Sequence, residues 1–202
     1  MKMRIILLLC CVAILPGCIS VHSYVDPQYH HANYDDLIRV NPPYALSIKV
    51  EYQLNGKERP RSQKSMQDYV ERSLRASGVA VPYEGKGEAA GEISVIANNV
   101  GNMSAAAAKG FGTGLTFGLV GSHVTDQYEV SIRLRLSGNV IEKKYEHAII
   151  STVGNASGPP GLSAVPPATA INQVVDDIVL NFLKDMQAEG AFLPKAPALI
   201  HI

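Results

Sequence analysis

The sequence lacks two features that would place it in familiar classes of protein. Its 18 basic side chains are balanced by 18 acidic ones, so the formal net charge is zero. A balanced charge provides no electrostatic basis for binding nucleic acid. Cysteine is also scarce, with three residues, at positions 10, 11 and 18. Because no cysteine follows Cys18, a disulfide framework is excluded and burial alone must hold the fold together.

Motifs that are typical of enzymes are missing as well. The sequence contains no Gly-x-Ser-x-Gly elbow and no His-x-Glu metal helix. Ser122, His123 and Asp126 are close in sequence, but adjacent side chains of an extended chain point apart. The pair His30-His31 has no cysteine or acidic partner at ligand spacing. The sequence therefore predicts no enzyme, no catalytic residue, no cofactor and no metal site.

The N-terminus has the three-part layout of a bacterial export signal. Lys2 and Arg4 precede an apolar run over residues 5–15, which a small residue and Cys18 follow. Eleven apolar residues are too few for a mature helix to span a bilayer. We therefore interpret residues 1–17 as a cleaved signal peptide.

The stretch Leu15-Pro16-Gly17-Cys18 resembles the lipobox of bacterial lipoproteins, with Pro16 in place of the usual small residue. The resemblance implies cleavage before Cys18 and three acyl chains on that residue. Each buried methylene contributes about 0.8 kcal/mol, so three chains would attach the protein permanently. Ile19 follows the cysteine in place of the aspartate that retains lipoproteins in the inner membrane. The resemblance thus implies an outer-membrane lipoprotein that faces the periplasm.

The remaining chain divides into three parts. Residues 18–43 show no sustained period and are predicted to be the lipidated N-terminus and a tether, which becomes ordered near Tyr34. Residues 44–188 are predicted to form one domain. Residues 189–202 contain two prolines and are predicted to be an apolar tail that drapes on the domain or is disordered.

Alternation of apolar and polar residues predicts the main strands of the domain. Strands are expected at 46–54, 79–83, 93–97, 126–136 and 140–153, and the last two form a long hairpin. In residues 126–136 one face is apolar, with Tyr128, Val130, Ile132, Leu134 and Leu136. Amphipathic helices are expected over 62–77 and 168–188, the first capped by Ser65 with Asp68 and ended by Gly78.

One-sided strands and two amphipathic helices predict an α+β fold. The expected architecture is a two-layer sandwich of a mainly antiparallel sheet with two helices on one face. This outline resembles small periplasmic outer-membrane assembly lipoproteins, including the lipopolysaccharide-assembly lipoprotein. The resemblance covers element order alone, so no functional residue is carried over from it.

A glycine-rich insert at 104–122 differs from the rest of the domain. Gly110, Gly114 and Gly118 are spaced four apart and alternate with Phe111 and Phe117. The spacing suits a close-packing helix face or a membrane-inserting hairpin, and the composition equally suits a flexible apolar loop. A dinucleotide loop is disfavoured, because that site requires a surrounding βαβ unit. These five residues are the predicted interaction site.

Two functions are consistent with these features. The first is a structural, assembly or partner-binding role in the cell envelope, with the membrane bound through Cys18 and an envelope protein or a second copy as partner. The alternative is a subunit of a membrane-inserted oligomer that uses the insert at 104–122. Neither involves nucleic acid.

Overall fold

The computed structural model describes residues 20–29, 31–101 and 122–193. In chain order the elements are β1 (Val21–Val25), the 3-10 helix η1 (Tyr34–Asp36), β2 (Tyr44–Leu54), β3 (Lys57–Glu58), α2 (Pro60–Ser77), β4 (Ala80–Pro82), β5 (Gly91–Gly101), β6 (Ser122–Leu136), β7 (Asn139–Val153) and α4 (Pro167–Ala188). Among these residues, neither long helix combines the length and the apolar composition needed to cross a bilayer.

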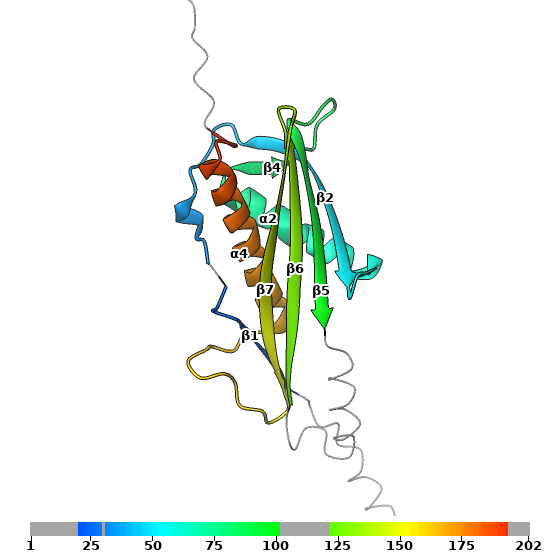
Figure 1. Ribbon diagram of the computed structural model, residues 1–202, viewed down its shortest axis with the longest axis vertical. Helices are drawn as coiled ribbons and strands as arrows, with labels where there is room; N and C mark the ends of the chain where they lie inside the picture. The colour runs from blue at the N-terminus through cyan, green and yellow to red at the C-terminus, as the bar shows by residue number, and fades with distance from the viewer. Residues whose placement is uncertain (1–19, 30, 102–121, 194–202) are drawn as a thin grey trace, which may run out of the picture.

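The strands in the described part of the chain form one sheet in the order β1-β7-β6-β5-β2-β3, with β4 paired to β2 (Figure 1). The pairs β1-β7, β7-β6, β6-β5 and β2-β3 are antiparallel. Strand β2 is parallel to both β4 and β5. Parallel neighbours require a crossover, which α2 provides. The prediction of a mainly antiparallel sheet is confirmed.

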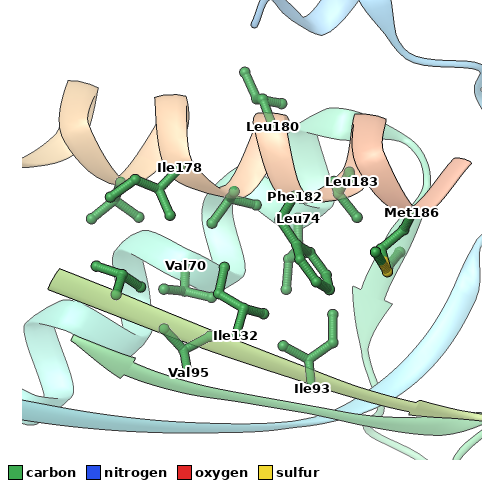
Figure 2. Close-up of a cluster of buried hydrophobic side chains, with 14 of the residues drawn as sticks. Val70, Leu74, Ile93, Val95, Ile132, Ile178, Leu180, Phe182, Leu183 and Met186 are labelled. Atoms are coloured by element: carbon green, nitrogen blue, oxygen red, sulfur yellow. The ribbon is translucent and has the colours of Figure 1, made fainter. Parts of the chain in front are cut away.

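Both helices cover one face of this sheet. Figure 2 shows Val70 and Leu74 of α2 and Phe182 of α4 lying over Ile93 of β5 and Ile132 of β6. Each of these side chains is at most 2% exposed. Burying one such side chain contributes roughly 1.5–3 kcal/mol, so this layer supplies much of the driving force for folding. The predicted two-layer α+β sandwich is confirmed.

The long hairpin has the predicted faces. Strands β6 and β7 pair from Ser122↔Val153 to Leu136↔Asn139. The five apolar side chains predicted to share one face of β6 are all buried. Arg133 lies opposite Glu142, and Arg133 Nη2 is 2.8 Å from Glu142 Oε2. Positive φ angles at Ser137 and Gly138, of 52° and 80°, close the hairpin as a tight turn requires.

The helices begin slightly earlier than predicted. Helix α2 begins at Pro60, a residue suited to the first turn, and ends at Ser77, after which Gly78 has a left-handed φ of 68°. The predicted cap at Ser65 is wrong, because Ser65 lies inside the helix and Asp68 instead binds Lys64 at 3.1 Å. Helix α4 begins at Pro167, and its apolar face is buried as expected.

The structure differs from the tether predicted over residues 18–43. Residues Val21–Val25 form the edge strand β1, paired antiparallel with β7. Further along, Leu37 and Val40 belong to the buried core. The side chain of Gln187 bonds both backbone groups of Ile38, at 2.9 Å to the N–H and 2.6 Å to the carbonyl. All these partners are far away in sequence, so no local period indicates the packing.

The described part of the tail packs on the domain. Phe192 is 1% exposed, and its ring meets that of Tyr44 edge-on at 5.2 Å between centroids. The Tyr44 hydroxyl donates a hydrogen bond to the Leu193 carbonyl at 3.0 Å. The tail is predicted either to drape on the domain or to be disordered, and it packs on the domain as far as Leu193. Residues 194–202 lie outside the described residues.

Candidate functional site

The residues predicted as sites lie outside the described residues. They are Cys18, Gly110, Phe111, Gly114, Phe117 and Gly118. The segments that lead into them are described, since Ser20 follows Cys18 by two residues and the insert connects Gly101 of β5 to Ser122 of β6.

These connection points lie at the same end of the sheet. Val153 pairs with Val21 on one side and with Ser122 on the other, while Gly101 pairs with Asp126 in the adjacent strand. The start of β1, the end of β5, the start of β6 and the end of β7 are therefore neighbours, at the lower end of the sheet in Figure 1. We call this the entry end. Both the N-terminal segment and the glycine-rich insert join the domain there.

A second feature, midway along β7, brings together two histidines and an aspartate. His31 Nδ1 is 2.8 Å and His147 Nε2 is 3.2 Å from the same oxygen, Asp177 Oδ2. One potential ligand atom from each residue lies within 4.8 Å of the other two. This His31–His147–Asp177 cluster is the candidate site in the described part of the chain.

Three different parts of the fold hold the cluster. His147 belongs to β7 and shares the inward face with Ile149, so its side chain is only 1% exposed. Asp177 lies on α4, directly above that face, and its side chain is 15% exposed. His31 comes from the connection between β1 and η1 and is the solvent-facing member, at 44%. The cluster is thus buried on one side and open on the other.

Neighbouring rings fix the orientation of His147. The Tyr29 ring stacks on it, with centroids 4.9 Å apart and planes 25° from parallel. The His31 ring meets it at an edge, with centroids 5.9 Å apart. At the other ring nitrogen, the Ala148 N–H donates to His147 Nδ1 at 2.9 Å, and the Ala148 carbonyl lies 3.3 Å from the same atom. The backbone therefore offers Nδ1 both a donor and an acceptor.

The sequence prediction of no metal site depended on the lack of a cysteine or acidic partner at ligand spacing from His30-His31. Asp177 supplies that partner from 146 residues beyond His31. One signal in the sequence points to part of the cluster, because His147 occupies an apolar-face position of the alternating strand. Nothing in the local sequence connects His31 to either partner. His30 lies outside the described residues.

A polar cluster between β5 and β6 lies near the entry end. Asn99 donates a hydrogen bond to the Tyr128 hydroxyl at 3.3 Å, and both residues are buried. Burial raises the pKa of Tyr128 well above its ordinary value. Burial likewise raises the pKa of the Asp126 carboxyl, and a hydrogen bond with Asn99 partly opposes the shift. Tyr128 and Asp126 thus each share a hydrogen bond with Asn99, whereas the buried Oδ1 of Asn99 has no hydrogen-bond partner among the described residues.

No protein-family model and no curated protein matches the chain. Among solved structures, the PelC dodecamer from Paraburkholderia phytofirmans has 13% identity and a TM-score of 0.36, over 82% of this chain and 97% of that one. A DUF330 protein from Xanthomonas campestris has 11% identity and a TM-score of 0.37, over 81% and 98%. A DUF4136 protein from Bacteroides thetaiotaomicron has 11% identity and a TM-score of 0.27, over 87% and 98%. Likenesses this low carry no argument about function or assembly.

Proposed function

We propose that this protein is an outer-membrane lipoprotein, anchored through Cys18 on the periplasmic face, with a non-catalytic role in binding or assembling envelope components. The observation that carries the proposal is the sequence Leu15-Pro16-Gly17-Cys18 after a basic N-terminus and an apolar run. Lipid on Cys18 would supply the attachment.

The position of β1 determines how close to the membrane this proposal would place the domain. Two residues of extended chain span at most about 7 Å, so a lipid on Cys18 would hold Ser20 and the entry end close to the membrane surface. Because β1 is paired into the sheet, the anchor would pull on the folded domain directly. The domain would then stand next to the bilayer, without the long spacer that a tether would provide.

The same geometry favours the second function, a subunit of a membrane-inserted oligomer. The glycine-rich insert joins β5 to β6 at the entry end, where β1 also begins. An anchor on Cys18 would therefore bring the insert to the membrane surface. Apolar residues with glycines at four-residue spacing suit contact with lipid tails or with the same segment of a second copy.

Replacing the anchor distinguishes the two functions. We would export the chain with Cys18→Ala behind a signal peptide whose cleavage does not require the lipobox, and ask whether the cleaved protein fractionates with soluble periplasmic proteins or with membranes. A partner-binding lipoprotein should become soluble, whereas an inserted oligomer should stay in the membrane fraction. If it stays, adding Gly114→Leu should release it, because a leucine would block close packing between glycine faces.

Mass spectrometry of the unchanged protein provides the control. The mature N-terminal peptide should begin at Cys18 and carry acyl chains. A free thiol on Cys18, or a mature chain that begins at another residue, would contradict the anchored lipoprotein and both functions that depend on it.

A further inference from the structure

We propose that His31, His147 and Asp177 form a binding site for a divalent transition-metal ion, with Zn²⁺ as the best chemical match. The three residues provide two imidazole nitrogens and one carboxylate oxygen, which are ordinary zinc ligands. The site is independent of the lipid anchor and of the glycine-rich insert, so it does not depend on the function proposed above.

The two distances to Asp177 are close to those between ligand atoms in a zinc site. Zinc bonds of about 2.0–2.1 Å in a tetrahedral site place neighbouring ligand atoms roughly 3.3 Å apart. His147 Nε2 and Asp177 Oδ2 are 3.2 Å apart, while His31 Nδ1 is 2.8 Å from the same oxygen. One potential ligand atom from each residue lies within 4.8 Å of the other two. Binding an ion would require the His31 ring to shift until both histidine nitrogens are about 3.3 Å from each other and from the carboxylate oxygen, and His31 is exposed enough to make that movement.

The backbone beside His147 can support the metal-binding tautomer. Metal bound at Nε2 requires the ring proton on Nδ1, where a carbonyl or carboxylate usually accepts it. The Ala148 carbonyl lies 3.3 Å from Nδ1 and can do so. Without metal, the Ala148 N–H donates to Nδ1 at 2.9 Å, and Nε2–H is then free to donate to Asp177. The ring proton therefore has an acceptor in both states, Ala148 with the ion and Asp177 without it, and metal binding would give up the Ala148 N–H bond to Nδ1.

The composition of the site selects the kind of ion. Two imidazoles favour zinc and its neighbours over Mg²⁺ and Ca²⁺, which prefer all-oxygen shells. One carboxylate partly compensates the charge of a divalent ion beside the buried His147 side chain. Three protein ligands leave one position of a tetrahedral zinc open, on the side where His31 meets solvent. Water or a donor group from a partner would complete the coordination there.

An ion at this position would join three separated parts of the chain. His31 belongs to the N-terminal connection, His147 to the sheet and Asp177 to α4. Metal binding would therefore fasten residues 26–33 to the domain and raise its thermal stability, because the ion binds the folded state and finds no such cluster in the unfolded chain.

The test is a Zn²⁺ titration of the full-length protein, purified in detergent without a histidine tag and stripped of metal with a chelator. Calorimetry should show one Zn²⁺ bound per chain. At a hundredfold excess of free Zn²⁺ over Kd, the melting temperature should rise by about 5 °C or more. His31→Ala and Asp177→Asn should each weaken Zn²⁺ binding by at least about tenfold, the minimum seen even when residues behind metal ligands are changed.

His22→Ala is the matched control, because His22 is an exposed histidine of the same N-terminal region that is outside the cluster. It should leave Zn²⁺ affinity within about twofold. His31 is solvent-facing, so His31→Ala should melt near the unchanged protein when metal is absent, and it decides the question even if Asp177→Asn misfolds. No Zn²⁺ binding by the unchanged protein, binding that His31→Ala leaves intact, or equal losses in His31→Ala and His22→Ala would each overturn the proposal.

Discussion

The β6-β7 hairpin and the N-terminal segment at residues 20–43 are both packed into this domain, yet they differ in what holds them there. The two strands of the hairpin, which are consecutive in sequence, pair residue by residue, and the apolar face of β6 is visible as an uninterrupted alternation from Tyr128 to Leu136. The N-terminal segment has one short strand, and it contacts β7 and α4 more than 100 residues away. Regular alternation in the sequence therefore predicts how the hairpin packs. The packing of the N-terminal segment is seen only in the folded domain.

The difference also concerns energy. The hairpin contributes whole rows of buried side chains, whereas the N-terminal segment contributes single anchoring points such as Leu37 and the Gln187 bonds to Ile38. A segment held by a few points should detach before the sheet unfolds. Substitutions in the two regions can test this ranking.

The largest expected effect is at the centre of the hairpin. Ile132→Asp would place an unpaired charge at a position that is 1% exposed, and we expect a loss of about 3 kcal/mol or more in the free energy of unfolding. The neighbouring Arg133→Gln removes a solvent-exposed ion pair and should cost about 0.5 kcal/mol or less. Chemical denaturation measures both. Equal losses would mean that the strand faces are exchanged, as a one-residue register shift would cause.

A smaller effect is expected in the N-terminal segment. Leu37 is 7% exposed and Ile38 is 56% exposed, so adjacent residues differ sharply in burial. Leu37→Ala should cost about 2–3 kcal/mol, the low end for a buried leucine, because a surface segment can collapse around the cavity. Ile38→Ala keeps the backbone bonds to Gln187 and should cost about 0.5 kcal/mol or less. If Leu37→Ala were as mild as Ile38→Ala in thermal melts, the segment would behave as the tether that the sequence predicts.

The smallest effect is a pH dependence at Asp126, in the first part of β6. Burial raises the pKa of its carboxyl, so the folded state holds the proton more tightly than the unfolded chain does. The stabilising contribution of the protonated form is complete below the ordinary pKa of 3.8 and is lost as the pH rises through the folded-state pKa. Asp126→Asn mimics the protonated acid. Its melting temperature should therefore exceed that of the unchanged protein slightly at pH 7 and match it near pH 3, and the opposite order at pH 7 would contradict the burial of this carboxyl.

The sequence predicts the fold better than it predicts the candidate site. Ile132 and its neighbours on β6 specify a face, and Gly78 specifies a helix end, because local spacing and backbone conformation determine these features. The His31–His147–Asp177 cluster depends on how β7, α4 and the N-terminal connection pack together. Spacing along the chain does not predict this packing. The one signal in the sequence is His147, which occupies a position on the apolar face of its strand.

The length of the hairpin sets how far the molecule would reach. Strand β7 has 15 residues, and at about 3.4 Å per residue the hairpin is roughly 50 Å long. Its turn at Ser137 is opposite the entry end, and Gly190 and Phe192 lie beside that turn. If lipid on Cys18 holds the entry end at the bilayer with the strands upright, the turn and Phe192 beside it would lie about 50 Å from the membrane surface. A label at Ser137 would then sample components well away from the membrane, while a label at Ser20 would sample the membrane surface.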